Sequence, residues 1–151
     1  MLRFVTVLCC WVLVLLTPLE GRAVKRFHFT NYRTTNGLSS NCIFKMEVDS
    51  RGFLWLATDY GINRFDGAAF RTYLKENYPS LSQNIAIQVC RTNGDGVYVS
   101  GYNGFLQRYD YATDSFESFF QPNFTEAVKD LYFDAVNDEH FALTTGGVYS
   151  P

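Results

Sequence analysis

The chain has 151 residues, of which 17% are aromatic, and its 13 basic and 15 acidic side chains give a net charge of −2. No cluster of Lys or Arg stands out, which argues against a nucleic-acid partner, since such partners normally require a basic patch. Proline is scarce and no long helical pattern is present, so the dense aromatic residues favour half-buried pleated sheets.

Residues 1–23 have the pattern of an export signal. Arg3 precedes an uncharged run from Phe4 to Leu16. That run is too short for a helix that crosses a hydrocarbon core about 30 Å thick. Gly21-Arg22-Ala23 places small residues where a signal peptidase needs them, so we expect cleavage after Ala23 rather than an uncleaved anchor. This predicts a periplasmic location.

Residues 24–151 are expected to form one β domain that opens with an extra strand at residues 27–33. The three segments that follow share one pattern at a step of 43 residues. Each begins with an aromatic residue and has a glycine six positions later, namely Trp55 and Gly61, Tyr98 and Gly104, and Phe141 and Gly147. Short apolar runs surround each segment, and Asp-Gly or Asn-Gly pairs mark tight turns between them. The first unit is expected to contain strands near 42–48, 53–58, 62–65 and 70–74.

Four strands every 40 to 50 residues are typical of a β-propeller, whereas the strands of a β-sandwich need not recur at a fixed step. The predicted fold is therefore all-β: an incomplete β-propeller with about two and a half four-stranded antiparallel blades plus the N-terminal strand. The predicted blades span residues 41–74 and 84–120, with a partial blade at 127–151. Because a propeller ring needs four or more blades, we expect the chain to be a fragment, a truncated reading frame or one part of a larger assembly.

The recurring aromatic residues Trp55, Tyr98 and Phe141 could stack on sugars, but a residue that recurs in every repeat is usually part of its core. We therefore expect them to pack between neighbouring blades. The glycines at 61, 104 and 147 are expected to serve turns or close approaches of the backbone.

The turn before each repeat glycine keeps its frame while its side chains vary, which is typical of a scaffold with a variable binding face. The loop that enters the first strand of each blade should lie on the same face. Tyr, Asn and Asp suit hydroxyl-rich ligands, although exposed turns are also polar for solvation alone. The candidate ligand-binding residues are Asp59, Tyr60, Tyr102, Asn103, Asn41 and Asn84.

No catalytic residue, metal site or cofactor is predicted. His28 and His140 occupy unrelated positions in the repeat and are expected at the surface. There is no histidine pair, no Cys-x-x-Cys and no glycine-rich phosphate loop. Cys42 and Cys90 occupy similar places in adjacent units; buried free thiols are the expected state, and a disulfide between blades is the alternative.

Three motifs of the first unit carry a family resemblance: Asn36-Gly37-Leu38-Ser39, the Asp49-x-x-Gly52-x-x-Trp55 core, and Thr58-x-x-Gly61-Ile62-Asn63-Arg64. Together they resemble the two-component regulator propeller repeat of periplasmic sensors in Bacteroidetes hybrid two-component histidine kinases. The second unit departs from the pattern, with Tyr98 in place of tryptophan and Gly101 in place of threonine.

The resemblance implies a longer, dimeric parent protein with further blades, a β-sandwich domain, a membrane helix, a kinase core and a regulator. It also implies sensing of glycan fragments, so the expected function is that of a ligand-sensing propeller fragment with an oligosaccharide ligand. One alternative is a fragment of a propeller lyase or hydrolase, which would need converging His, Asp or Glu on the loop face. The other is a structural or protein-interaction propeller, which would have apolar turns.

Overall fold

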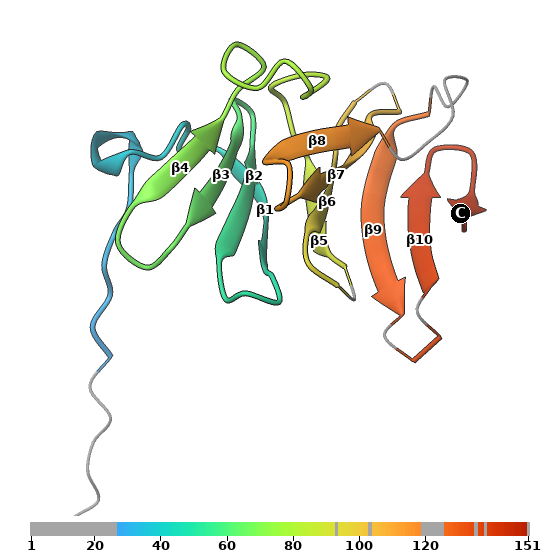
Figure 1. Cartoon of the computed structure of the whole chain (residues 1–151), viewed down its shortest axis with the longest axis horizontal. Coiled ribbons are helices and arrows are strands. Elements are labelled where there is room, and N and C mark those ends of the chain that lie inside the picture. Colours follow the sequence, from blue (N-terminus) through green and yellow to red (C-terminus); the bar gives the residue numbers. More distant parts are fainter. Residues whose placement is uncertain are drawn as a thin grey trace, which may run out of the picture. The chain divides into compact units, whose positions relative to one another are not determined.

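The structure is a computed structural model that describes residues 27–92, 94–102, 104–118, 126–134, 136–137 and 139–150. All its strands belong to three antiparallel sheets that follow one another along the sequence (Figure 1). The three sheets lie in one compact unit that begins at Asn31. The all-β prediction is confirmed, and the predicted export signal at 1–23 lies outside the described residues.

The first sheet has the strand order β1-β2-β3-β4. Its strands lie within one residue of those predicted: β1 (Ile43–Val48), β2 (Leu54–Thr58), β3 (Ile62–Phe65) and β4 (Phe70–Tyr73). The β1–β2 turn contains Gly52 at φ +84°, and the β3–β4 turn contains Gly67 at φ +99°. In the latter turn Asp66 Oδ1 accepts the backbone N–H groups of Ala68 and Ala69, both at 2.8 Å. Local turn chemistry therefore sets this sheet.

The second sheet repeats the same order, with β5 (Gln88–Arg91), β6 (Val97–Ser100), β7 (Leu106–Asp110) and β8 (Ser115–Ser118). Its first strand begins later than the predicted blade start at residue 84. The reason is that the Ala86 N–H donates to the Thr58 carbonyl of the first sheet at 3.0 Å. The segment that enters β5 thus bonds to the preceding blade before it joins its own.

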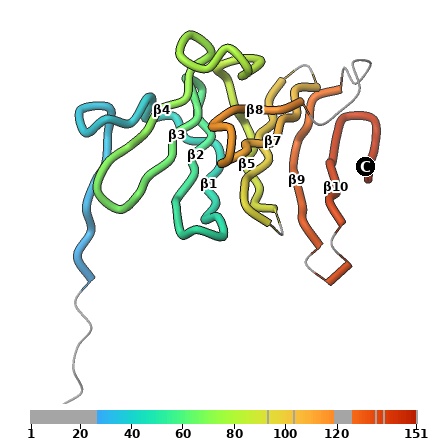
Figure 2. The backbone as a smooth tube through the Cα atoms, in the orientation of Figure 1, coloured from blue at the N-terminus to red at the C-terminus, as the bar shows by residue number. Residues whose placement is uncertain are grey.

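The third sheet has the order β11-β10-β9 and corresponds to the predicted partial blade. It consists of β9 (Val128–Asp134), β10 (Glu139–Thr144) and the two-residue β11 (Val148–Tyr149). The first strands of successive sheets are neighbours, β1 beside β5 and β5 beside β9. Figure 2 shows how the connection from β4 to β5 runs across the strand ends of the first two sheets.

Aromatic side chains fill the space between the first two sheets. Trp55 and Tyr73 are fully buried and stack with centroids 5.3 Å apart. Tyr109 of the second sheet lies 4.9 Å from Trp55 and 5.3 Å from Tyr73, and Phe116 lies 5.5 Å from Tyr73. Ring pairs of this kind contribute about 0.5–1.5 kcal/mol beyond their buried area. This aromatic cluster therefore stabilises the contact between the first two blades.

The extra strand predicted at residues 27–33 stays a prediction, because the three described sheets do not include the last blade that it would complete. The structure assigns no strand there, and among the described residues before β1 the only regular element is the 3-10 turn η1 (Thr34–Asn36). An alternating sequence becomes a strand only when a neighbouring backbone pairs with it, and no described strand pairs with this segment. Phe27 and Phe29 are accordingly exposed.

Candidate functional site

The β2–β3 turn of the first sheet, at residues 58–61, is held by its own backbone and one hydroxyl. Thr58 Oγ1 donates to the Gly61 carbonyl at 2.6 Å and accepts the Tyr60 N–H at 3.2 Å. Gly61 has φ +101°, and a Cβ there would lie 2.8 Å from Leu74 Cδ2. The threonine and the glycine of the motif are therefore both required by the turn itself.

The Asn-Gly-Leu-Ser lead of the motif clamps the same turn from outside. The Ser39 N–H donates to Asn63 Oδ1 at 3.0 Å, Asn63 Nδ2 donates to Ser39 Oγ at 2.6 Å, and the Ser39 and Thr58 hydroxyls lie 3.2 Å apart. Asn63 and Thr58 are fully buried. This small polar network satisfies itself internally, which is the condition for keeping polar groups inside a protein.

The β6–β7 turn of the second sheet is one residue longer than the β2–β3 turn, and the Gly101 N–H donates to the Phe105 carbonyl at 3.1 Å, whereas the third sheet repeats the threonine of the first. In the second, Gln107 takes the place of Asn63 and accepts the Ser82 N–H at 2.9 Å. A side chain at Gly101, where the first unit has Thr58, would overlap the Ile85 carbonyl oxygen, which explains the glycine. In the third, Thr144 Oγ1 donates to the Gly147 carbonyl at 3.1 Å. The first and third turns thus share one frame held by a threonine hydroxyl, and the second has a longer turn without that threonine.

Three of the predicted ligand-binding residues stand exposed on this frame. Asp59 and Tyr60 form the tip of the first turn, and Tyr102 occupies the equivalent of Asp59 in the second; Tyr60 is 54% and Tyr102 50% exposed. Among the described residues, no side-chain hydrogen bond or ion pair engages the Asp59 carboxylate or the two tyrosine hydroxyls. Asn103 lies outside the described residues.

The two predicted asparagines have structural tasks instead. Asn84 Oδ1 accepts the Lys75 N–H at 2.6 Å, and its amide nitrogen donates to both Glu76 oxygens at 3.1 Å. Asn41 Oδ1 accepts the Thr34 N–H at 3.1 Å. These bonds fix the conformation of the loops that enter β5 and β1. The two asparagine side chains therefore have a structural role in these loops.

The predicted proximity of turns and loops is nevertheless present. The Gly61 N–H donates to the Asn84 carbonyl at 2.8 Å, and Gln83 Nε2 donates to the Tyr102 carbonyl at 2.8 Å. The loop at residues 75–87 therefore touches the β2–β3 turn of both the first and the second sheet. We call the exposed side chains of Asp59, Tyr60 and Tyr102, with this loop between them, the turn face.

Two of the three recurring aromatic residues, Trp55 and Tyr98, pack between blades as predicted. Trp55 contacts Tyr109 and Tyr111 of the second sheet. Tyr98 lies edge-on to His140 of the third sheet at 4.6 Å. Phe141 is partly buried and lies 6.5 Å from Tyr132 within its own sheet. The expectation of a surface position for His140 is wrong, because its ring packs between Tyr98 and Phe133; His28 is exposed.

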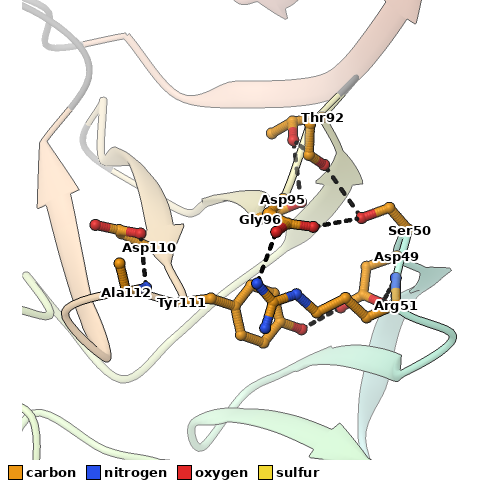
Figure 3. A network of polar contacts seen from close by, with 10 residues as sticks. Asp49, Ser50, Arg51, Thr92, Asp95, Gly96, Asp110, Tyr111 and Ala112 are labelled. Atoms are coloured by element: carbon orange, nitrogen blue, oxygen red, sulfur yellow. Dashed lines mark hydrogen bonds and ion pairs between the residues drawn. The ribbon is translucent and has the colours of Figure 1, made fainter.

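The opposite end of the first two sheets carries a polar network (Figure 3). Asp49, only 5% exposed, accepts the Arg51 and Phe53 N–H groups at 2.9 and 3.0 Å. Its other oxygen accepts Trp55 Nε1 at 2.6 Å and the Tyr111 hydroxyl of the second sheet. The aspartate carboxylate of the Asp-x-x-Gly-x-x-Trp motif therefore holds the β1–β2 turn in shape and fixes the indole of the motif at the contact between the blades.

A second bridge in this network joins the β1–β2 turn to the β5–β6 turn. Arg51 Nη2 lies 2.6 Å from Asp95 Oδ2, and its guanidinium stacks 4.0 Å above the Tyr111 ring. This hydrogen bond holds the pKa of Asp95 below its usual value, and burial, followed by the bond to Asp49, raises the pKa of Tyr111. Sequence inspection missed these contacts because they join turns 44 residues apart.

Charged residues of the first strands form a groove of about 290 Å³ across all three sheets. Lys45 lies 3.4 Å from Asp130, and Glu47 lies 3.8 Å from Arg91. Both cysteines are free thiols; Cys90 is buried beside this groove, whereas Cys42 is exposed, contrary to the expectation for it. Burial raises the pKa of Cys90 to about 11. Within the described residues, His, Cys, Asp and Glu form no group of three or more that could hold a metal ion.

Comparison with known proteins shows what the first repeat unit is similar to. Residues 37–60 match the family model described as two component regulator propeller. Over 60 residues the chain is 37% identical to Histidine kinase P4 of Formosa agariphila, a match that covers 40% of this chain and 4% of the kinase.

Solved structures show the same architecture. The extracellular domain of a putative hybrid two-component system from B. thetaiotaomicron is 27% identical, with a TM-score of 0.59 over 75% of this chain and 17% of that one. The extracellular domain of a putative one-component system from the same organism is 23% identical, with a TM-score of 0.61 over 72% of this chain and 15% of that one, which supports the fold alone. The chain thus spans a small part of each relative.

These relatives are regulatory, and the solved ones are extracellular domains. They agree with a sensor-type propeller rather than a catalytic one, and with a location outside the cytoplasm. No helix among the described residues has the length and apolar character needed to cross a membrane.

Proposed function

We propose that the chain supplies blades to the ligand-sensing propeller of a two-component sensor, because residues 37–60 match the family model described as two component regulator propeller. In this proposal residues 1–23 direct export to the periplasm. The remaining blades and the signalling domains belong to a longer, dimeric parent protein, and the membrane is reached only through that parent.

We further propose that the turn face binds a hydroxyl-rich ligand of the oligosaccharide class. The observation that carries this proposal is the contrast between the fixed backbone of the β2–β3 turn and the exposed side chains at its tip. Buried hydrogen bonds fix the backbone at residues 58–61, while the side chains of Asp59 and Tyr60 face solvent. Tyrosine offers a flat stacking surface at low entropic cost, and a carboxylate accepts paired hydrogen bonds from sugar hydroxyls.

Titration calorimetry with neutral oligosaccharide pools tests the proposal on the full chain. Tyr60→Ala and Tyr102→Ala should each weaken binding about tenfold, the loss expected from one stacking contact of about 1–1.5 kcal/mol. Tyr132→Ala is the matched control, because Tyr132 is 65% exposed on β9, away from the turn face. Equal affinities for all three variants, or the absence of any saccharide binding, would refute the turn face as the site.

A further inference from the structure

A cleft of about 310 Å³ opens between the first two sheets at the end opposite the turn face. Its floor and walls come from the β1–β2 turn, β3 and β4 of the first sheet and from the β7–β8 turn of the second. The residues that matter most in it are Arg51, Phe53, Arg64, Arg71, Tyr111 and Asp114. Three arginines in so small a space call for a chemical explanation.

Two of these arginines are committed to carboxylates of the second sheet. Arg51 pairs with Asp95 at 2.6 Å, and Arg71 pairs with Asp114. The second oxygen of Asp114 accepts the Tyr109 hydroxyl at 2.5 Å. Asp49, behind Tyr111, already accepts four hydrogen bonds, which is about the capacity of a carboxylate.

Arg64 has no such partner. Its guanidinium lies 4.6 Å from the Phe53 ring centroid and 5.5 Å from that of Tyr111. Within the described part of the chain, no hydrogen bond or ion pair engages its side chain. The side chain is half-buried, so five N–H donors are held in place by ring faces at the wall of a cleft without a protein acceptor.

The second sheet provides an internal comparison. Across the first sheet the register places Arg64 opposite Trp55 on one side and opposite Arg71 on the other. The equivalent row of the second sheet is Tyr98, Arg108 and Glu117. Like charges directly opposite each other destabilise a sheet, whereas opposite charges stabilise it. The first sheet therefore has a cation, Arg71, where the second has an anion, Glu117. Asp114 of the second sheet pairs with Arg71, so Arg64 is the arginine of this row that has no acid opposite it.

We propose that this cleft binds an oxyanion, a carboxylate or sulfate group, through the guanidinium of Arg64, with Arg71 beside it. Arginine matches planar oxyanions with two parallel hydrogen bonds, and the aromatic walls strengthen such bonds by excluding water. The site is separate from the turn face and does not depend on it. The anion is either a free ion or the acidic substituent of a saccharide.

Arginine side-chain NMR on the full chain tests the proposal directly. Sodium sulfate, acetate and glucuronate are titrated at constant ionic strength, with glucose as the uncharged control. The Nε–Hε signal of Arg64 should shift and saturate with at least one of the anions, whereas that of Arg108 should not. Similar affinities for acetate and glucuronate would identify the anion alone as the ligand, and a much higher affinity for glucuronate would identify an acidic saccharide.

Variants separate the site from general salt effects. Arg64→Gln should weaken binding at least tenfold, while Arg108→Gln, the same repeat position in the second sheet, should leave it unchanged. Linear, unsaturated shifts of Arg64, or equal losses in both variants, would overturn the proposal. Should Arg64→Gln fail to fold, the wild-type titration decides alone, because a saturable Arg64 shift is the result that the proposal requires.

Discussion

Replacing Asp49 tests whether one carboxylate holds the first blade to the second. Asp49→Ala removes the acceptor of four donors: the Arg51 and Phe53 N–H groups, Trp55 Nε1 and the Tyr111 hydroxyl. A hydrogen bond to a charged group contributes about 1.5–3 kcal/mol, and a buried donor left without a partner carries a desolvation cost. The two aromatic donors lie at the blade contact, so we expect a loss of about 3–5 kcal/mol in the free energy of unfolding.

Urea unfolding followed by far-UV circular dichroism measures this loss, and an unchanged slope with denaturant would show that only stability has changed. Asp49→Asn should lose less, about 2 kcal/mol, since its carbonyl still accepts the two backbone N–H groups while its NH₂ faces the indole N–H. Asp59→Ala is the control and should lie within about 0.5 kcal/mol of wild type, because Asp59 is exposed. An Asp49→Ala variant within 1 kcal/mol of wild type would refute the reasoning (a threshold of roughly one net hydrogen bond).

Gly61→Ala should destabilise the chain by about 1–3 kcal/mol, and by more than Gly52→Ala. Both glycines have positive φ, but only a Cβ at Gly61 would meet Leu74 and the Tyr73 carbonyl. Equal losses of the two variants in urea unfolding would contradict the crowding argument. Trp55→Ala should cost about 3–5 kcal/mol by the same assay, as expected for a large buried ring, whereas a loss below about 1 kcal/mol would remove Trp55 from the core. Iodoacetamide labelling at pH 8 with peptide mapping should modify Cys42 quickly and Cys90 only on unfolding, since Cys90 is buried with a pKa of about 11; similar rates would disprove its protection. Hydrogen bonds lower the pKa values of five carboxyl groups, those of Asp66, Asp95, Asp110, Glu126 and Asp134. The stabilisation of the folded state by these carboxylates is full above their unfolded pKa values near 4 and is lost as pH falls through their lower folded pKa values. An unfolding midpoint that stays constant from pH 5 to 2.5 would contradict this.

The strands of the first blade could be predicted because their signals are local. Gly52, Gly61 and Gly67 mark turns that require positive φ, and the apolar runs between them are too short for helices. The same local logic placed the β2–β3 turns and the loop at residue 84 on one face. It does not decide residues 27–33, where the pattern alternates but strand formation depends on a pairing partner outside the described blades.

The candidate sites were less predictable because they depend on contacts between blades. Asn84 and Asp59 look alike as exposed polar residues in the sequence, yet only the structure reveals that the Asn84 amide is bound by Lys75 and Glu76. Arg64 belongs to the repeat motif, so the sequence alone predicts a structural role for it. Its unmatched donors become visible only when the register sets it against Arg71 rather than against an acid.

The position of the loop at residues 75–87 connects these observations to sensing. This loop bonds to the first sheet through Gly61 and Thr58 and to the second through the Tyr102 carbonyl and the Gln107 amide. A ligand held by Asp59, Tyr60 and Tyr102 would therefore contact side chains whose backbones are tied to one shared segment. Binding would favour the blade arrangement that brings these side chains together, by a free energy that grows with ligand concentration relative to Kd. Since Asp49 and Arg51 fasten the same two blades at the opposite end, such a bias would act on the blade pair as a unit, which is the property that a sensor propeller needs to transmit binding.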